Sequence, residues 1–554
     1  MSTRSTKSSA SRKPVSTFGP ADRNQSDAAT TELSERFWRI AAIAILAVGA
    51  FLRIFNLNLV PLHHDEGVNG NFLVKLVRDG VYQYDPANYH GPTLYYFSAF
   101  FPWLLKILFG PSARETYGLT TISIRLVPAL FGVATIWLIL LLRKYVGSIA
   151  ALSGALLLAI SPGAVYLSRY FIHETLFVFF TLGIVVAVLR CFSERNPFYL
   201  LVAAASAALM FATKETAMIS VAVLLIALAM TLIYVRLFGR SAAPAKPRKQ
   251  RKTWTGVGLS DFVYQLGGPI NIGIWLVLAV LVFVGLNILF YSSFFTNYPK
   301  GVYDALRTFD FWSKTGKEAH VHPITTYIKW LIKEESPLLF LGSVGAIAAV
   351  FSRKWPVALF CSLWAFGLTA AYSLVPYKTP WLVLNFVVPL AIAAGYAIQT
   401  IYEVDGRQLR LPAVFLLAAV CVNSYQMVDL NFVNYDNDDI YYVYVYAHTK
   451  RETKQLVDEI DKYARRASQG NTGITIMSPD YWPLPWYLRN YSRVGYYGRL
   501  TQTVEPIVIA NETQRTEVEG TLGGSYRLVP SGSGTGAFAL RPGVDLLLYV
   551  RGDL

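Results

Sequence analysis

The chain has 554 residues, of which 54% are hydrophobic and only 15% are charged. An ordinary soluble domain is roughly a quarter charged, so this composition excludes one and indicates a chain built for lipid. Lys and Arg outnumber Asp and Glu by 50 to 35. We read this excess as an orientation signal, because no basic groove interleaved with aromatic residues indicates nucleic-acid binding.

The first part of the chain, residues 1–36, is rich in Ser, Thr, Lys and Arg and has no long apolar segment. Such a composition is typical of a disordered tail and not of a cleavable signal peptide, which needs an apolar core. We therefore predict a cytoplasmic tail, with the first membrane span directing insertion.

Long apolar segments follow through residues 37–427. A bilayer-spanning helix needs roughly 20 predominantly apolar residues, and about eleven segments approach or exceed that length. They are residues 38–55, 119–142, 147–166, 174–190, 198–212, 217–237, 272–295, 337–352, 356–375, 381–400 and 411–427. The fold class predicted is mainly α, a polytopic helical membrane protein.

The segment 94–109 is apolar and aromatic but short, and it contains Pro102 and Lys106. If this segment does not cross, the short basic loops all lie on the side of the basic N-terminus, as the positive-inside rule requires. If it crosses, the basic run 246–252 moves outside with most of the other basic loops. We therefore predict an interfacial helix on the outer surface of the plasma membrane.

This topology places residues 428–554 outside the membrane. They contain strand-like segments at 474–477, 507–510 and 546–550, and an amphipathic helical pattern at 451–466. These patterns predict a small extracytoplasmic α/β domain after the last span.

The same topology brings the polar segments of the chain to the outer face. Ionisable groups near membrane depth are costly, so a cluster of them indicates function. The polar segments are residues 62–67, within an outer loop that covers 56–118, and residues 168–174, 213–215, 298–335 and 376–380.

The first of these segments contains the adjacent acids Asp65 and Glu66. Two acids in a short ordered loop could supply a general base and an orienting or metal-binding carboxylate. The alternative is a solvated loop in which Asp65 is the N-cap of a helix that begins near Gly67.

Basic residues lie close to the outer ends of three spans. Arg169 could hold a phosphate through both guanidinium nitrogens, or could simply extend to the interface. Lys214 and Lys378 lie between apolar spans, and prolines on both sides of Lys378 stiffen its loop. These cations and the acidic loop favour a pocket for an anionic lipid headgroup, with interfacial anchoring as the alternative.

Glu174 begins a predicted span, so helix-dipole stabilisation explains it as well as substrate binding does. His63, His64, His90 and His173 could form a metal site, but their spacing is not that of metal ligands, and hydrogen-bonding roles are favoured. No metal ion is expected to be required, although Asp65, Glu66 and these histidines could bind a divalent ion.

Several motifs resemble those of the GT-C superfamily of membrane glycosyltransferases. Residues 64–67 (HDEG) are similar to the Asp-Glu motif of protein O-mannosyltransferases and aminoarabinose transferases. Residues 167–174 (LSRYFIHE) and 212–215 (ATKE) resemble their Ser-Arg and Thr-Lys elements. More narrowly, residues 84–92, 376–381 and 446–453 look like a prokaryotic branch of glycosyltransferase family 39-like proteins that is labelled flippase activity-associated.

The resemblance implies an enzyme that moves a hexose or mannose-like sugar from a polyprenyl-phosphate donor to a protein, glycan or lipid acceptor, with inversion. It implies Asp65 as the general base and Glu66 as the residue that positions acceptor or base. His173 and Glu174 replace the Leu-Asp of the superfamily pattern. The substrate-binding residues expected are Arg169, Glu174, Lys214, Tyr377, Lys378, His64 and His90, with Arg169, Lys214 and Lys378 on the donor phosphate.

Two other classes of protein are alternatives. A flippase for lipid-linked sugars, or its accessory protein, would use the same headgroup pocket without chemistry. It would need internal repeats or broken helices around a midplane site, and we find neither pattern in the sequence. An assembly or receptor protein would use the outer domain, but would give no reason for polar loops to converge.

Overall fold

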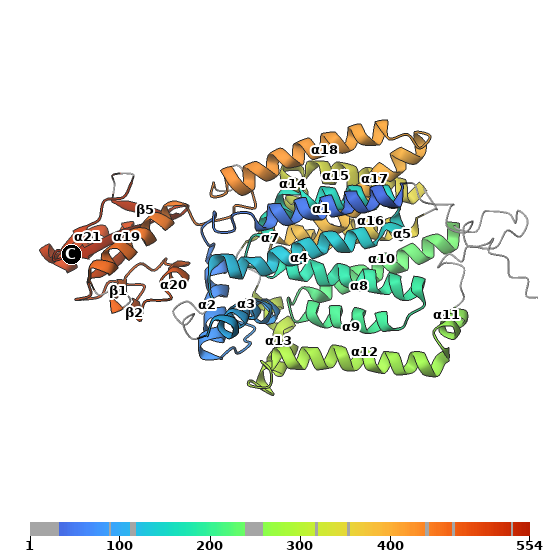
Figure 1. Ribbon diagram of the computed structural model, residues 1–554. Coiled ribbons are helices and arrows are strands. Elements are labelled where there is room, and N and C mark those ends of the chain that lie inside the picture. The colour runs from blue at the N-terminus through green and yellow to red at the C-terminus, as the bar shows by residue number, and fades with distance from the viewer. Residues whose placement is uncertain are drawn as a thin grey trace, which may run out of the picture.

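The computed structural model describes residues 33–87, 90–110, 118–238, 259–315, 320–351, 355–437, 442–467, 471–532, 534 and 536–554. A bundle of long helices forms the larger part, and a smaller domain with a β-sheet lies at one end of it (Figure 1). Most of the predicted N-terminal tail and the whole basic run 246–252 lie outside the described residues.

Eight helices are long and apolar enough to cross a membrane. They are α1 (Glu35–Ile54), α4 (Thr121–Leu141), α8 (Glu174–Glu194), α10 (Ala217–Phe238), α12 (Gly268–Tyr291), α16 (Pro356–Leu374), α17 (Leu384–Val404, preceded by the short helix Pro380–Val383) and α18 (Arg410–Val428, continued by a π-helical turn to Val433). The count reaches 10 if each of two bent helix pairs is one span.

The remaining predicted span, 198–212, is helix α9 (Phe198–Phe211). Its 14 residues would extend only about 21 Å, against a hydrocarbon core of roughly 30 Å. Every predicted span therefore contains a helix, but α9 is too short to cross an unperturbed bilayer on its own. It packs between α8 and α12 (Figure 1).

The bent pairs are α6 (Ser148–Ala159) with α7 (Pro162–Ser168), at 61°, and α14 (Thr326–Glu334) with α15 (Ser336–Phe351), at 111°. The expectation that the chain contains no broken helices was therefore wrong. Pro162 begins α7, and a proline at that position ends the preceding helix because it has no N–H to donate.

Polar side chains replace the backbone hydrogen bonds that the first bend removes. Arg53 donates to the carbonyl oxygens of Ala159 and Leu158 at 2.9 and 3.1 Å. Glu335, at the second bend, accepts from the Ser161 hydroxyl at 2.8 Å and from the Gly163 N–H at 2.9 Å. The two broken segments are therefore joined at their bends, since free backbone groups in an apolar setting need such partners.

Two helices of the outer loop lie at the end of the bundle that faces the smaller domain. Helix α2 (His64–Asp79) runs across that end, and α3 (Thr93–Phe109) lies beside it (Figure 1). Helix α3 contacts α2 and α4 and has 17 residues with Pro102 inside. It is not one of the helices long enough to span. Three shorter or amphipathic helices, α5 (Arg143–Val146), α11 (Leu259–Gln265) and α13 (Lys300–Thr315), lie between spans.

The C-terminal domain contains a mixed sheet with the strand order β2-β1-β3-β6-β4, and β5 also pairs with β6. The pairs β1–β2 and β1–β3 are parallel, and β6 is antiparallel to its neighbours. The strands are β1 (Gly473–Ile476), β2 (Arg493–Tyr496), β3 (Ile507–Asn511), β4 (Tyr526–Leu528), β5 (Ala537–Arg541) and β6 (Val544–Arg551). The α/β character predicted from the sequence is confirmed.

Alternate residues of β3 enter two separate apolar layers, as the period of a strand requires. Ile507 and Ile509 pack with α19 (Glu452–Ala467) on one face of the sheet. Val508 and Ala510 pack with α21 (Arg515–Leu522) on the other. The sheet is therefore covered on both faces by its own helices.

Small residues let the C-terminal domain approach helix α2 closely. A Cβ atom on Gly67 would lie 2.5 Å from Pro483, and one on Gly70 would lie 2.6 Å from Trp486. Trp486 belongs to the short helix α20 (Leu484–Tyr487), and the Leu62 N–H donates to the Tyr487 hydroxyl at 2.9 Å. The domain is thus packed directly against the outer loop.

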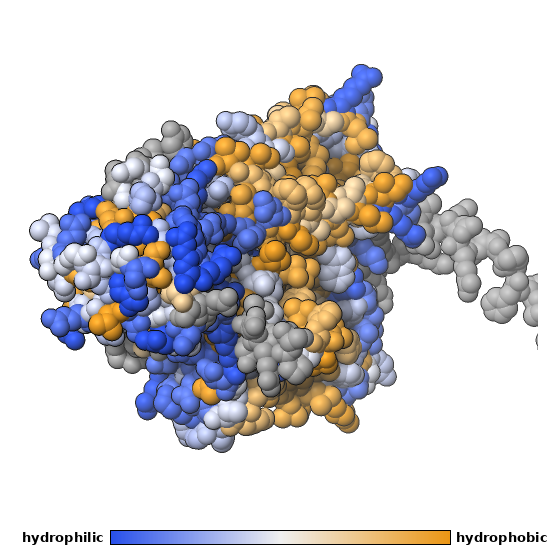
Figure 2. Space-filling model, turned by 60° about the vertical axis from the view of Figure 1, so that its left-hand side comes forward, coloured by the Kyte–Doolittle hydropathy of each residue, from blue (hydrophilic) through white to orange (hydrophobic). Residues whose placement is uncertain are grey.

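The surface of the bundle is apolar, as expected of a surface in contact with lipid. Figure 2 shows hydrophobic residues gathered over the bundle, whereas the C-terminal domain is largely hydrophilic. In the apolar window of α12, 0% of the residues are buried within the protein. A helix this apolar and this exposed belongs in lipid, so the chain is a multi-pass membrane protein.

Helix packing in the bundle depends on close backbone approach, which gives a first prediction. A Cβ on Gly395 of α17 would lie 2.2 Å from the Ala150 carbonyl oxygen, so Gly395→Ala must push α6 and α17 apart. We expect a loss of about 1–3 kcal/mol in stability, the usual cost of overpacking. Thermal unfolding in lipid nanodiscs measures it.

The matched control is Gly285→Ala in α12, where an added Cβ meets nothing within 4 Å. Its unfolding temperature should equal that of the wild type or exceed it slightly, because alanine favours the helix. Equal unfolding temperatures for the two variants would contradict the packing argument.

Candidate active site

Helix α2 begins at the predicted acidic motif, but not where the sequence suggested. His63 is the N-cap and its Nδ1 accepts from the Asp65 N–H at 3.1 Å, while Glu66 accepts from the His63 N–H at 3.0 Å. This reciprocal arrangement is a capping box with histidine in place of Ser or Thr. The alternative in which Asp65 caps a helix that begins near Gly67 was therefore wrong: the helix begins at His64.

Glu66 is fully buried and uses both carboxylate oxygens within the protein. Arg125 Nε donates to one oxygen at 2.7 Å and Arg125 NH2 to the other at 2.5 Å. The Phe171 N–H donates to the first oxygen at 2.7 Å. A carboxylate held by four donors in this way has no capacity left for a substrate, and Glu66 instead fixes the start of α2, on which Asp65 lies.

Asp65, one residue earlier, has the opposite surroundings. Its side chain is 25% exposed, and its nearest basic atom, His63 Nδ1, lies 4.0 Å away. Within the described part of the chain, no donor makes a hydrogen bond to its carboxylate. Burial raises the pKa of Asp65, with Glu174 adding to the effect, and His64, His90 and His320 oppose it. These are the properties of a carboxylate that can accept a proton.

Two further ion pairs lie near Asp65. Glu174 begins α8 and accepts from Lys214 Nζ, and both side chains are buried. His90 Nδ1 lies 2.9 Å from Glu215 Oε2. Burial favours a higher pKa for Glu215, but the charge of His90 and their hydrogen bond outweigh it and lower that pKa.

Backbone hydrogen bonds fix the loop before α3 against the turn between α9 and α10. The Gly91 N–H donates to the Thr213 carbonyl at 3.1 Å, and the Thr93 N–H to the Ala212 carbonyl at 3.2 Å. A Cβ on Gly91 would lie 2.2 Å from that Ala212 oxygen. The predicted segments at 84–92 and 212–215 are thus brought together, which places His90 beside Lys214 and Glu215.

The segment around Tyr377 and Lys378 closes another side of the site. The Lys378 N–H donates to the His320 carbonyl at 3.0 Å, and Lys378 Nζ donates to the Val375 and His322 carbonyls at 2.5 and 3.2 Å. Burial raises the pKa of Tyr377, and Asp65 and Glu174 add to this effect. Tyr377 therefore keeps its phenol proton and can donate a hydrogen bond.

Arg169 is not placed as the phosphate prediction requires. Its NH1 donates to the Leu52 and Phe55 carbonyls at 3.0 and 2.6 Å, and its NH2 donates to the Asn56 carbonyl at 3.0 Å. These carbonyls are at the C-terminal end of α1, where a cation is favoured. We therefore assign Arg169 to the end of α1 and leave it out of the proposed phosphate site.

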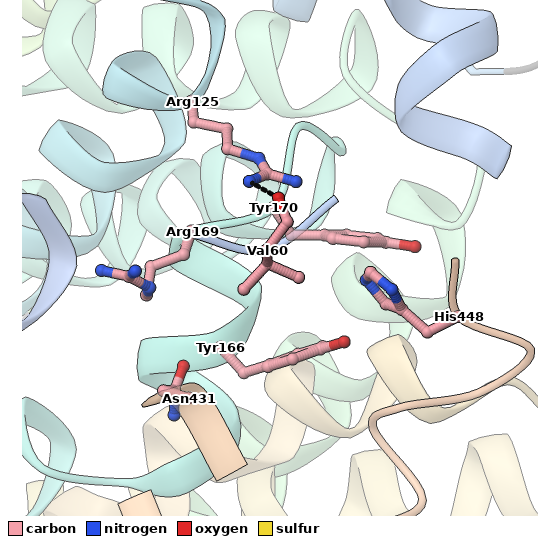
Figure 3. A pocket seen from close by; sticks show the side chains of 7 residues that line it. All are labelled: Val60, Arg125, Tyr166, Arg169, Tyr170, Asn431 and His448. Atoms are coloured by element: carbon pink, nitrogen blue, oxygen red, sulfur yellow. Dashed lines mark hydrogen bonds between the residues drawn. The ribbon is translucent and has the colours of Figure 1, made fainter. Parts of the chain in front are cut away.

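A narrow cavity is lined by Val60, Arg125, Tyr166, Arg169, Tyr170, Asn431 and His448 (Figure 3). Arg125 crosses its upper side and donates to the Val60 carbonyl at 2.8 Å. Asp65 is not among the lining residues.

The histidines of the sequence motif have packing and hydrogen-bonding roles. His63 Nε2 lies 3.2 Å from the Tyr446 carbonyl, and His173 Nε2 lies 2.9 Å from the Gly91 carbonyl. His64 faces Trp482, with ring centroids 6.0 Å apart. Among the described residues, no three His, Cys, Asp or Glu side chains lie together in a group that could hold a metal ion.

Three residues of this site were not singled out from the sequence, although His320 and Tyr446 lie within the marked segments 298–335 and 446–453. Arg125 lies inside an apolar span, and a charge in that setting was the signal that could have revealed it. His320 and Tyr446 come from segments far apart in the chain, and their side chains meet at 2.8 Å. His320 also has a φ of 56°, which is uncommon for a residue other than glycine and is typical of functional sites.

Comparisons with known proteins agree with this architecture. Residues 99–243 match the family model of the dolichyl-phosphate-mannose-protein mannosyltransferases. The matched range includes Arg125, Glu174 and Lys214 but not Asp65. The chain shares its fold with solved GT-C membrane glycosyltransferases, as the motifs predicted. A comparison with curated protein sequences gives no match.

The particular structures that it resembles are those of ArnT from Cupriavidus metallidurans. The apo form has a TM-score of 0.61 at 14% identity, and the form bound to undecaprenyl phosphate has a TM-score of 0.57 at 13% identity. In both comparisons the match covers 93% of this chain and 98% of the ArnT chain. At this identity the likeness concerns the fold.

The contrast between the adjacent acids gives a second prediction. Glu66→Gln leaves the buried Arg125 without its counter-charge, which typically costs about 3–5 kcal/mol. We expect a marked fall in the unfolding temperature. Asp65→Asn should leave that temperature unchanged or raise it, because the raised pKa of Asp65 means that its charged form is unfavourable in the fold.

The double variant Glu66→Gln/Arg125→Met tests the cause. Removing the orphaned charge should recover part of the stability that Glu66→Gln alone loses. If both single variants of the acids unfold at the same temperature, the assignment of Glu66 as the structural acid is overturned.

Proposed function

We propose that this protein is a membrane glycosyltransferase that moves a sugar from a polyprenyl-phosphate donor to an acceptor on the extracytoplasmic face. The observation that carries the proposal is the state of Asp65. Of the acids gathered here, Glu66, Glu174 and Glu215 each face a cationic or basic partner, whereas Asp65 has a partly exposed carboxylate with a raised pKa.

The reaction is a single displacement at the anomeric carbon, which inverts its configuration. The acceptor oxygen forms a bond to that carbon while the bond from carbon to the phosphate oxygen breaks. The acceptor proton passes to Asp65, and the bonding electron pair leaves with the lipid phosphate. Holding both substrates in line in a partly dry site supplies much of the acceleration.

The lipid phosphate needs donors that face its developing charge. The Lys214 ammonium has three N–H groups, and one of them donates to Glu174. This ion pair fixes the direction in which the other two point. Lys378 is held by the Val375 and His322 carbonyls, and Tyr377 keeps its proton. We assign these groups, with His90, to the donor phosphate and sugar, where preorganised donors stabilise the leaving group.

Two findings support the choice of a lipid-linked donor. The matching family model describes enzymes that use dolichyl-phosphate mannose, and the ArnT structure of similar fold holds undecaprenyl phosphate. We propose a carrier of this chemical class. The basic residues of α5 at the opposite end of the bundle from α2 favour a cytoplasmic location for that end, and hence an extracytoplasmic site (Figure 1).

The broken helices are the feature that favours the flippase alternative. Several of the polar groups at their bends, however, are used inside the protein. Glu335 spans the gap between the two bends, and Arg53 holds the carbonyls of Leu158 and Ala159. We therefore treat the breaks as structural, and a protein that binds donor without turnover is an outcome of the experiment below.

The third prediction concerns activity. Purified protein in lipid nanodiscs, given a panel of polyprenyl-phosphate sugars, should release or transfer the sugar, and Asp65→Asn should reduce the rate by about 10²–10⁴-fold while donor binding persists. The reason is that an amide cannot take up the acceptor proton. Rate and binding are measured on the same preparations.

The control is Asp79→Asn, the same change at the exposed far end of α2, which should behave as the wild type. Turnover by Asp65→Asn at the wild-type rate would refute the role of Asp65. Donor binding without turnover in every variant would favour an accessory or flippase function instead.

The fourth prediction is the pH dependence. Since burial raises the pKa of Asp65, its carboxyl is protonated and inactive at acidic pH. The rate of transfer should therefore rise as pH increases through this raised pKa, above the usual range for Asp, and then level off. A profile of kcat/KM that is already flat at the usual pKa of an exposed Asp would contradict it.

A further inference from the structure

A row of aromatic rings leads from the C-terminal domain to the start of α2. The rings of Tyr496 and Tyr481 have centroids 5.1 Å apart, and those of Tyr481 and Trp482 are 5.9 Å apart. Trp482 then faces His64 at 6.0 Å, and His64 is the neighbour of Asp65 in the chain. The row therefore ends beside the carboxylate that we propose as the base.

Only part of this aromatic segment is available to a ligand. Trp486 is 1% exposed and packs over Gly70, and the Tyr487 hydroxyl is used by the Leu62 N–H. By contrast, Tyr496 is 36% exposed, and Tyr481 and Trp482 are half-buried. One edge of Trp482 rests near Gly67, which fixes the ring in place. The accessible rings are thus those of the row itself.

Charged groups lie alongside the row. Asp480 accepts from Arg541, and the side chains of Asp480 and Arg541 are 40% and 21% exposed. Both charges act on the pKa of His64, which burial lowers, so this ion pair lies close to the end of the row. Because Arg541 is already paired with Asp480, the pair offers hydrogen bonds to neutral hydroxyls more readily than a site for a second anion.

We propose that this row, Tyr496–Tyr481–Trp482, binds a glycan and that the acceptor of the transfer is therefore a carbohydrate. The inference rests on the proposed function. A pyranose has apolar C–H faces that pack on aromatic rings and hydroxyl edges that take part in hydrogen bonds, as the row and its ion pair provide. The ring spacing is close to the length of one sugar unit.

A glycan lying along the row would place its last sugar at His64 and a hydroxyl group at Asp65. A peptide is the rival occupant, because β2 is an edge strand of the sheet and an extended peptide could pair with it. Such a peptide would bind through the backbone of Arg493–Tyr496 and would not need the rings of Tyr481 and Trp482. The rings favour the glycan.

The test measures binding of mannose, glucose and galactose oligosaccharides of increasing length to the full chain in nanodiscs by calorimetry. Affinity for at least one series should rise with length until the row is covered. Trp482→Ala should weaken binding about tenfold, the loss of roughly 1.4 kcal/mol that one aromatic contact supplies. Trp482→Phe, which keeps a ring, should retain most of the affinity.

The matched control is Tyr497→Ala, which removes an exposed tyrosine next in sequence to the row but outside it. It should bind as the wild type does, and unfolding temperatures check that each variant is folded. No binding of any oligosaccharide by the wild type, equal losses in Trp482→Ala and Tyr497→Ala, or binding of extended peptides in place of oligosaccharides would each overturn the proposal.

A second measurement separates this inference from the function on which it rests. It records whether the wild type releases sugar from polyprenyl-phosphate donors when no oligosaccharide is present. Release together with failed oligosaccharide binding would reject the glycan acceptor and leave the transferase. Oligosaccharide binding without release from any donor would reject transfer, and with it the acceptor role, while leaving a glycan-binding row.

Discussion

The buried ion pair between Glu66 and Arg125 is the interaction on which the outer face of this protein depends. Arg125 also donates to the Leu57, Val60 and Pro61 carbonyls, so one side chain of α4 holds the linker from α1 and the first turn of α2. Glu66 also holds the loop before α8, because its carboxylate accepts a hydrogen bond from the Phe171 N–H. Removing charges from water is costly, and such a pair is favourable only when its hydrogen bonds are satisfied, as they are for this carboxylate.

Because that pair fixes the start of α2, neighbouring acids of the same chemistry take different roles. Glu66 is saturated by donors, Glu174 is neutralised by Lys214, and Glu215 faces His90. Asp65 alone among them lies on the partly exposed side of α2, with its charged form disfavoured by burial. Environment, not residue type, thus separates structural acids from a candidate base, as it does wherever paired carboxylates divide acid and base functions.

The C-terminal domain completes this arrangement. Gly67 and Gly70 lie on the same helix as Asp65, and they admit Pro483 and Trp486 of that domain at distances that a larger residue would not allow. Helix α2 is consequently held from one side by the membrane bundle and from the other by the domain. The rings that lead to His64 come from the domain side, while the cations assigned to the donor come from the bundle.

The sequence by itself determined where the helices lie, because apolar segments of bilayer length have few other stable states, and it determined the α/β character of the last domain and the acidic motif. It did not reveal the bends near Pro162 and Glu335, the short length of α9, or the use of Arg169 at the end of α1. The residue pattern alone did not tell Asp65 from Glu66, and only the resemblance gave the two acids different roles. These features depend on contacts between residues far apart in the chain, such as His320 with Tyr446, and only the tertiary structure decides which polar group finds a partner and which stays available.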